Sequence, residues 1–83
     1  MDSVTASEEK VSTRIIDALV EFGAEREALR PEASLEELDI DSLDLFELGQ
    51  ILHHEFSIDI EPHEFEDVTT LGEAQGVMLG HLK

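Results

Sequence analysis

The chain has 83 residues, with 21 acidic against 5 basic side chains, so its formal net charge at pH 7 is −16. No lysine or arginine lies between Pro31 and Leu82, and a surface of that kind repels nucleic-acid phosphates and anionic lipids but attracts basic patches on other proteins. The absence of cysteine excludes disulfide bonds and any thiol from the protein's own side chains.

These bounds predict one small domain. No apolar run approaches the roughly 18 residues that a membrane span requires. The opening residues 1–7 lack the basic and apolar regions of a secretory signal. We therefore expect a soluble, cytoplasmic monomer with a mobile tail at residues 1–7 and a single domain at residues 8–83.

A first helix is predicted from Ser7 or Glu8 to Phe22, with Ser7 as a candidate N-cap. Apolar residues recur on one face of this segment with helical spacing. Gly23 follows the last of them, in the position where glycine commonly ends a helix. The stripe consists of Val11, Ile15, Ala18, Leu19 and Phe22.

Residues 24–41 form a long connection that contains Pro31, which prevents a helix from running through it. A connection of this length in a small domain is expected to be packed or functional. Ser34 and Glu37 match a capping box, which predicts a helical turn at residues 35–38. The candidate core anchors are Leu29, Leu35, Leu38 and Ile40.

A second helix is predicted from Leu43 to about Glu55, with Ser42 as its N-cap and Asp44 in its first turn. Its core-facing residues repeat with helical spacing, whereas Leu43 and Phe46 lie on or near the exposed side. The core-facing set is Leu45, Leu48, Leu52 and Phe56.

The remaining chain predicts an extended loop at residues 57–60, a short third helix at Pro62–Glu66, and a last helix that begins with a capping box at Thr70–Glu73. The last helix has a core stripe, and its glycines at 72, 76 and 80 are expected to weaken it. The predicted fold is all-α, a four-helix bundle with a long loop between helices 1 and 2 and a short third helix. The core stripe of the last helix consists of Leu71, Ala74, Met78 and Leu82.

The segment Leu38–Leu48, with Asp41-Ser42-Leu43 at its centre, resembles the serine motif of acyl carrier proteins. The resemblance extends from about Val11 to Leu82. It implies that Ser42 carries 4′-phosphopantetheine, transferred from coenzyme A and attached through a phosphodiester. It also implies a carrier and not an enzyme, with acyl groups held as thioesters on the thiol of the prosthetic group.

The resemblance points to a stand-alone (type II) carrier of a dissociated fatty-acid or polyketide synthase. A peptidyl or aminoacyl carrier shares the same serine chemistry and stays open as an alternative. An acidic protein-interaction module that is never modified, such as a DNA mimic, is the alternative from a different class.

In the carrier family, the exposed face of the second helix meets partner enzymes. By resemblance, the partners are a carrier-protein transferase (holo synthase) and acyl-loading and condensing enzymes with basic docking patches. The docking residues expected on this chain are Asp41, Leu43, Asp44, Phe46, Glu47 and Gln50.

Three residues depart from the family pattern. Gly49 replaces a usual aliphatic residue, and we expect it to leave space for an acyl chain or for closer packing by a neighbouring helix. His53 and His54 stand where acidic residues are usual, and they make the surface charge depend on pH.

Hydrolase chemistry with Ser42 as the nucleophile and a specific metal site both fit the sequence poorly. His53 lies about 16 Å along the helix from Ser42, too far to serve it as a general base, and no Gly-x-Ser-x-Gly elbow is present. The histidines and acids match no zinc or EF-hand spacing, so we expect no specific metal site.

Overall fold

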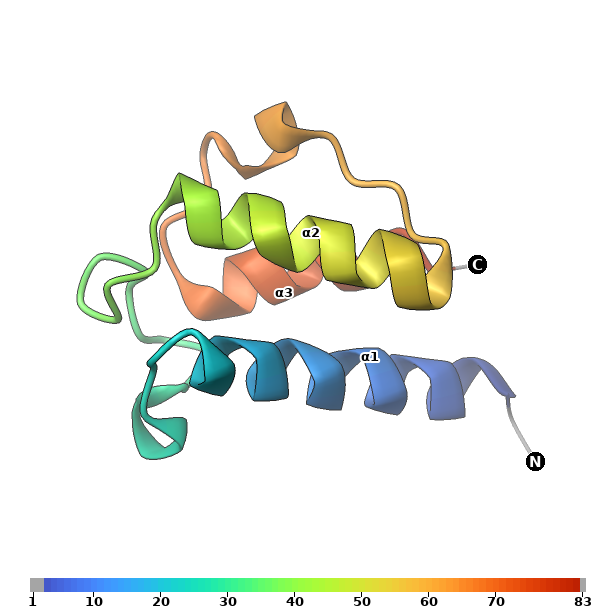
Figure 1. Ribbon diagram of the computed structural model, residues 1–83, viewed down its shortest axis with the longest axis horizontal. Coiled ribbons are helices and arrows are strands. Elements are labelled where there is room, and N and C mark those ends of the chain that lie inside the picture. Colours follow the sequence, from blue (N-terminus) through green and yellow to red (C-terminus); the bar gives the residue numbers. More distant parts are fainter. Residues whose placement is uncertain (1–2, 83) are drawn as a thin grey trace.

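The computed structural model describes residues 3–82, which form three α-helices: α1 (Ser3–Glu21), α2 (Ser42–Phe56) and α3 (Leu71–Leu79). α2 and α3 run in the same direction and α1 runs opposite to them (Figure 1). The short third helix expected at Pro62–Glu66 is a four-residue 3-10 helix, η2 (Pro62–Phe65). The all-α prediction is therefore confirmed for the described residues, but the predicted bundle of four helices is not, because a 3-10 turn replaces the short third helix.

The start of α1 differs from its prediction, because the helix begins at Ser3 and Ser7 lies inside it. The polar segment ahead of Glu8 contains neither Gly nor Pro, so nothing in it breaks a helix. Met1 and Asp2, which belong to the expected tail, lie outside the described residues.

α1 ends at Glu21, one residue before the predicted Phe22, and Gly23 follows it as predicted. Gly23 has a φ of 116°. Its N–H donates to the carbonyl of Val20 at 3.0 Å, and the N–H of Ala24 donates to the carbonyl of Leu19 at 3.0 Å. This pair of bonds is a Schellman motif, which turns the chain away from the helix axis.

The three predicted helical stripes meet in one core, in which α1 packs against both α2 and α3. The stripe residues Phe22, Phe56 and Leu82 are half-buried at its margin. The connection and the segment after α2 add three more buried side chains, Leu35, Ile40 and Ile58. The buried residues within the helices are Val11, Ile15, Ala18, Leu19, Leu45, Leu48, Leu52, Leu71, Ala74 and Met78.

The long connection contains a 3-10 helix, η1 (Arg26–Ala28), and it is anchored on the start of α3. The N–H of Leu35 donates to the carbonyl of Thr69, and the N–H of Leu71 donates to the carbonyl of Ala33, both at 2.9 Å. These bonds flank an isolated antiparallel bridge between Ser34 and Thr70. The connection is therefore packed, which explains how a small domain holds so long a loop.

The start of α3 confirms its predicted capping box. The hydroxyl of Thr70 accepts from the N–H of Glu73, and the Glu73 carboxylate accepts in return from the N–H groups of Thr69 and Thr70. The bond from the Thr69 N–H is the main cause that lowers the pKa of Glu73. This end of α3 is thus fixed both by its own cap and by the connection.

Gly72 has a role that its sequence interpretation as a weakening residue missed. Its N–H donates to the carbonyl of Pro31 at 2.9 Å. A Cβ at this position would lie 3.0 Å from the same Pro31 oxygen and 3.2 Å from Pro31 Cβ, whereas a Cβ at Gly76 would meet nothing within 4 Å. Gly72 therefore permits the close approach of the connection to α3.

The two glycines provide a matched test of this packing. We expect Gly76→Ala to raise the free energy of unfolding by up to about 1 kcal/mol through helix propensity. We expect Gly72→Ala to lower it, because the added methyl group displaces Pro31. Urea unfolding followed by circular dichroism measures both, and an equal gain from the two variants would contradict the proposed close contact.

Candidate functional site

The first turn of α2 is capped by Asp41, with extended φ and ψ of −106° and −174°. The N–H of Asp44 donates to Asp41 Oδ1 at 3.0 Å, and the N–H of Asp41 donates to Asp44 Oδ2 at 3.2 Å. This reciprocal pair is a capping box made of two aspartates. The prediction that Ser42 caps the helix is therefore wrong, because Ser42 is the first residue inside it.

The sequence explains why the cap lies one residue earlier than expected. With Asp41 as the N-cap, the third helical residue is Asp44, whose carboxylate can accept from the cap's own N–H. With Ser42 as the N-cap, that position would belong to Leu45, which cannot accept a hydrogen bond. The spacing Asp41-x-x-Asp44 was the signal that could have placed the cap.

Ser42 is exposed, as are its neighbours Asp41 and Leu43. Among residues 3–82, the Ser42 hydroxyl takes part in no hydrogen bond. The side chain thus lies at a helix N-terminus, with its oxygen accessible to solvent and uncommitted to the fold.

The residues ahead of the cap fix its position. Ile40 is buried, and its N–H donates to the carbonyl of Leu35 at 2.9 Å. In the same segment, the N–H of Leu38 donates to the carbonyl of Ser34 at 3.2 Å, which confirms the helical turn predicted at residues 35–38. Asp39 has a φ of 58°, in the left-handed region that aspartate tolerates better than most residues.

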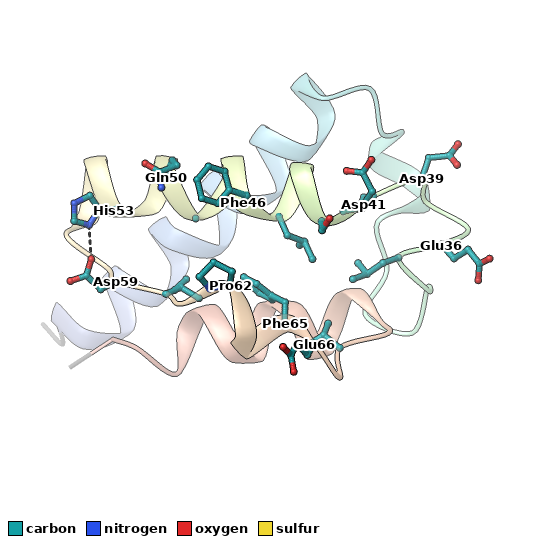
Figure 2. A pocket seen from close by; sticks show the side chains of 17 residues that line it. Glu36, Asp39, Asp41, Phe46, Gln50, His53, Asp59, Pro62, Phe65 and Glu66 are labelled. Carbon is teal, nitrogen blue, oxygen red and sulfur yellow. Dashed lines mark ion pairs between the residues drawn. The ribbon is translucent and has the colours of Figure 1, made fainter.

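A groove of ≈ 870 Å³ runs along α2, and Ser42 lies on its lining. α2 forms one wall, and η2 with Pro62 and Phe65 lies across from it (Figure 2). The α2 residues on the groove are Ser42, Leu45, Phe46, Gly49, Gln50 and His53. The other lining residues are Leu35, Glu36, Asp39, Ile40, Asp41, Asp59, Ile60, Pro62, Phe65, Glu66 and Val68.

The two ends of the groove differ in chemistry. Acidic residues, Glu36, Asp39 and Asp41, lie at the end near Ser42 (Figure 2). At the opposite end, His53 Nδ1 lies 2.8 Å from Asp59 Oδ1. An apolar middle, which includes Leu45 and Phe65, separates these ends.

The η2 wall is held to the end of the chain by a second histidine. His81 Nε2 and Glu64 Oε1 share a hydrogen bond of 2.7 Å. The pKa of Glu64 is lowered first by the backbone N–H of Glu61 and then by this contact with His81. The wall opposite α2 therefore has a fixed position in the fold.

Gly49 lies on the groove, and a Cβ there would meet no atom within 4 Å. Of the two expectations for this residue, the open space fits the structure, whereas packing by a neighbouring helix does not.

The six residues expected to dock partners divide between two surfaces. Leu43 is 72% exposed and Phe46 is 52% exposed. Asp44 is half-buried by its place in the capping box. Asp41, Phe46 and Gln50 line the groove, and the rest of the set, Leu43, Asp44 and Glu47, does not.

Sequence reasoning missed the wall of the groove. Pro62 and Phe65 were expected only to start and anchor a helix, and Asp59 carried no local signal of its approach to His53. Within residues 3–82, no group of three or more potential ligands could hold a metal ion. No described helix is long and apolar enough to cross a membrane.

An exposed hydroxyl at a helix start, beside an open groove, is accessible to an enzyme that could attach a group to it. Comparison with known families agrees, because the family described as "phosphopantetheine attachment site" matches residues 13–74. The chain belongs to this family of non-catalytic carrier domains, whose covalent prosthetic group is 4′-phosphopantetheine and whose partners are transferases and synthase enzymes. The predicted membership in the phosphopantetheine-binding carriers, the cofactor and the non-enzymatic role are thereby confirmed.

The assignment of the cap can be tested by stability. We expect Asp41→Ala to lower the free energy of unfolding by about 1 kcal/mol, because the N–H of Asp44 loses its acceptor. Asp41→Asn keeps an acceptor oxygen and is expected to cost less. Urea unfolding with Ser42→Ala as the control checks this, and a larger loss from Ser42→Ala would restore Ser42 as the cap.

Proposed function

We propose that Ser42 is the attachment point of phosphopantetheine and that the protein is an acyl carrier of a dissociated fatty-acid or polyketide synthase. The observation that carries the proposal is the capping box of Asp41 and Asp44, which leaves the Ser42 hydroxyl exposed at the first position of α2. Its oxygen is available to a modifying enzyme without any loss of helix capping.

The backbone at the helix start favours a phosphodiester on Ser42, against the repulsion of the nearby acidic side chains. In the transfer, Ser42 Oγ forms a new bond to phosphorus, the diphosphate bond of coenzyme A breaks so that adenosine 3′,5′-bisphosphate leaves, and the hydroxyl proton passes to a base of the transferase. Backbone N–H groups and the dipole at the start of a 15-residue helix favour a phosphate there. The prosthetic group supplies a thiol, which this cysteine-free chain lacks.

The groove supports the carrier role further. It begins at Ser42, and its middle is apolar where Leu45 and Phe65 line it. The space beside Gly49 enlarges it. A tethered acyl chain could lie there between reactions and bury apolar surface.

The attachment site is tested by intact mass after incubation with coenzyme A and a carrier-protein transferase. We expect one phosphopantetheinyl group on the wild type and none on Ser42→Ala. Ser57→Ala is a matched control, because Ser57 is an exposed serine just past the other end of α2, and it should be modified normally. Modification that survives Ser42→Ala would exclude Ser42 as the site.

We further propose that partners dock on the outer face of α2, around the exposed Leu43 and Glu47. Acids beside an apolar side chain suit a basic enzyme patch that surrounds a small hydrophobic pocket. Attraction between such surfaces mainly raises the association rate and weakens with salt.

Docking is tested by transfer rates. We expect Leu43→Asp and Glu47→Lys each to slow phosphopantetheine transfer at limiting carrier concentration, about tenfold for a loss near 1.4 kcal/mol, with the helical circular dichroism unchanged. Glu8→Lys makes the same charge change on an exposed residue of α1 and is the control. Equal rates for the three variants and the wild type would exclude this face.

A further inference from the structure

The end of the groove farthest from Ser42 holds an imidazole and a carboxylate that the proposed function does not use. His53 Nδ1 lies 2.8 Å from Asp59 Oδ1, and the two side chains are 59% and 86% exposed. A pair so exposed contributes little to stability. Stability therefore does not account for the pair, whereas both of its side chains line the groove.

Ser42 and His53 lie on the same stripe of α2. They are eleven positions apart, which is close to three full turns, so both face the groove. At the rise of an α-helix, this spacing places them about 16 Å apart along the axis.

The reach of the prosthetic group matches this separation. About fourteen bonds join the serine oxygen to the terminal sulfur of phosphopantetheine, and an extended chain of that many bonds spans roughly 16 Å at the length per bond of a polypeptide. An arm that starts at Ser42 and follows the groove would therefore bring its thiol to His53.

The carboxylate decides which nitrogen of His53 is available. A carboxylate only accepts hydrogen bonds, so a proton on the ring is favoured at Nδ1, next to Asp59. Nε2 then keeps its lone pair and can accept a proton from another group.

We propose that His53 binds the thiol of the phosphopantetheine arm and accepts its proton at Nε2, with Asp59 as a positioning residue. This inference rests on the proposed attachment at Ser42. The proton moves from sulfur to Nε2 and leaves a thiolate beside an imidazolium, with no other bond changed and no further reactant. The thiol thereby becomes more reactive toward acyl donors at neutral pH.

The charged groups around His53 and its exposure to solvent limit how far it can raise the reactivity of the thiol. The carboxylate of Asp59 lies 2.8 Å from the His53 ring, and Glu66 lines the same groove on the opposite side. On α2, His54 and Glu55 are its neighbours, and Glu55 is paired with Arg14 of α1 at 3.0 Å. In solvent, an ion pair at about 4 Å shifts an ionisation equilibrium by roughly fivefold.

The experiment uses protein whose modification has been verified by intact mass, and it measures the rate of thiol alkylation by iodoacetamide. At pH 7 we expect His53→Gln to react about threefold to fivefold more slowly than the wild type, and Asp59→Asn to be slowed to a smaller extent. His54→Gln, which changes an adjacent exposed histidine outside the groove lining, should match the wild type. Above the alkyl thiol pKa of about 8.5, all rates should converge.

Two results would overturn the inference: equal rates at pH 7, or a similar loss in His54→Gln. A second measurement is the NMR signal of the His53 ring, which we expect to differ between the free thiol and its S-methylated form; identical signals would also overturn it. Failure to gain the prosthetic group at Ser42 would instead contradict the proposed function, so the two failures are distinguishable.

Discussion

The reciprocal hydrogen bonds between Asp41 and Asp44 are the interaction on which the site depends. A helix needs acceptors for its first N–H groups, and a serine at that point would ordinarily supply one. Here Asp41 accepts from the N–H of Asp44 and Asp44 accepts from the N–H of Asp41, so the helix start is capped without the hydroxyl of Ser42. Helix capping by Asp41 and the proposed attachment at Ser42 therefore fall on different residues and do not compete.

The cap in turn depends on how the connection is held. Leu35 and Ile40 are buried, and backbone bonds from the connection reach Thr69, Leu71 and Gly72 at the start of α3. These contacts orient the chain that enters α2, which places Asp41 and Ser42. Gly72 belongs to the same arrangement, because only a residue without a side chain lets Pro31 approach its backbone so closely.

The sequence predicted what periodicity and local hydrogen bonding determine. The helical stripes follow from spacing, and Gly23 as a helix end and the capping box at Thr70 follow from residue type at a fixed position. Serine is a favoured cap, so the sequence predicts Ser42, but the pairing of Asp41 with Asp44 places the cap one residue earlier. The approach of Asp59 to His53 and of Gly72 to Pro31 depends on tertiary packing, which leaves no pattern in the chain. The 3-10 form of η2 reflects a segment too short for an α-helix.

The two ends of the groove differ in the charge of the groups that they favour. Near Ser42, acidic side chains suit a basic enzyme that approaches the helix start, but they would oppose a thiolate. At the far end, the imidazole of His53 is the group that could stabilise one, and Asp59 lies where it compensates the resulting positive charge. About three turns of α2 separate Ser42 from His53, so the proposed attachment site and the proposed thiol site lie at opposite ends of the groove. The proposed role of His53 therefore rests on its distance from Ser42. Neither the neighbouring residues nor the net charge of the chain would indicate that role.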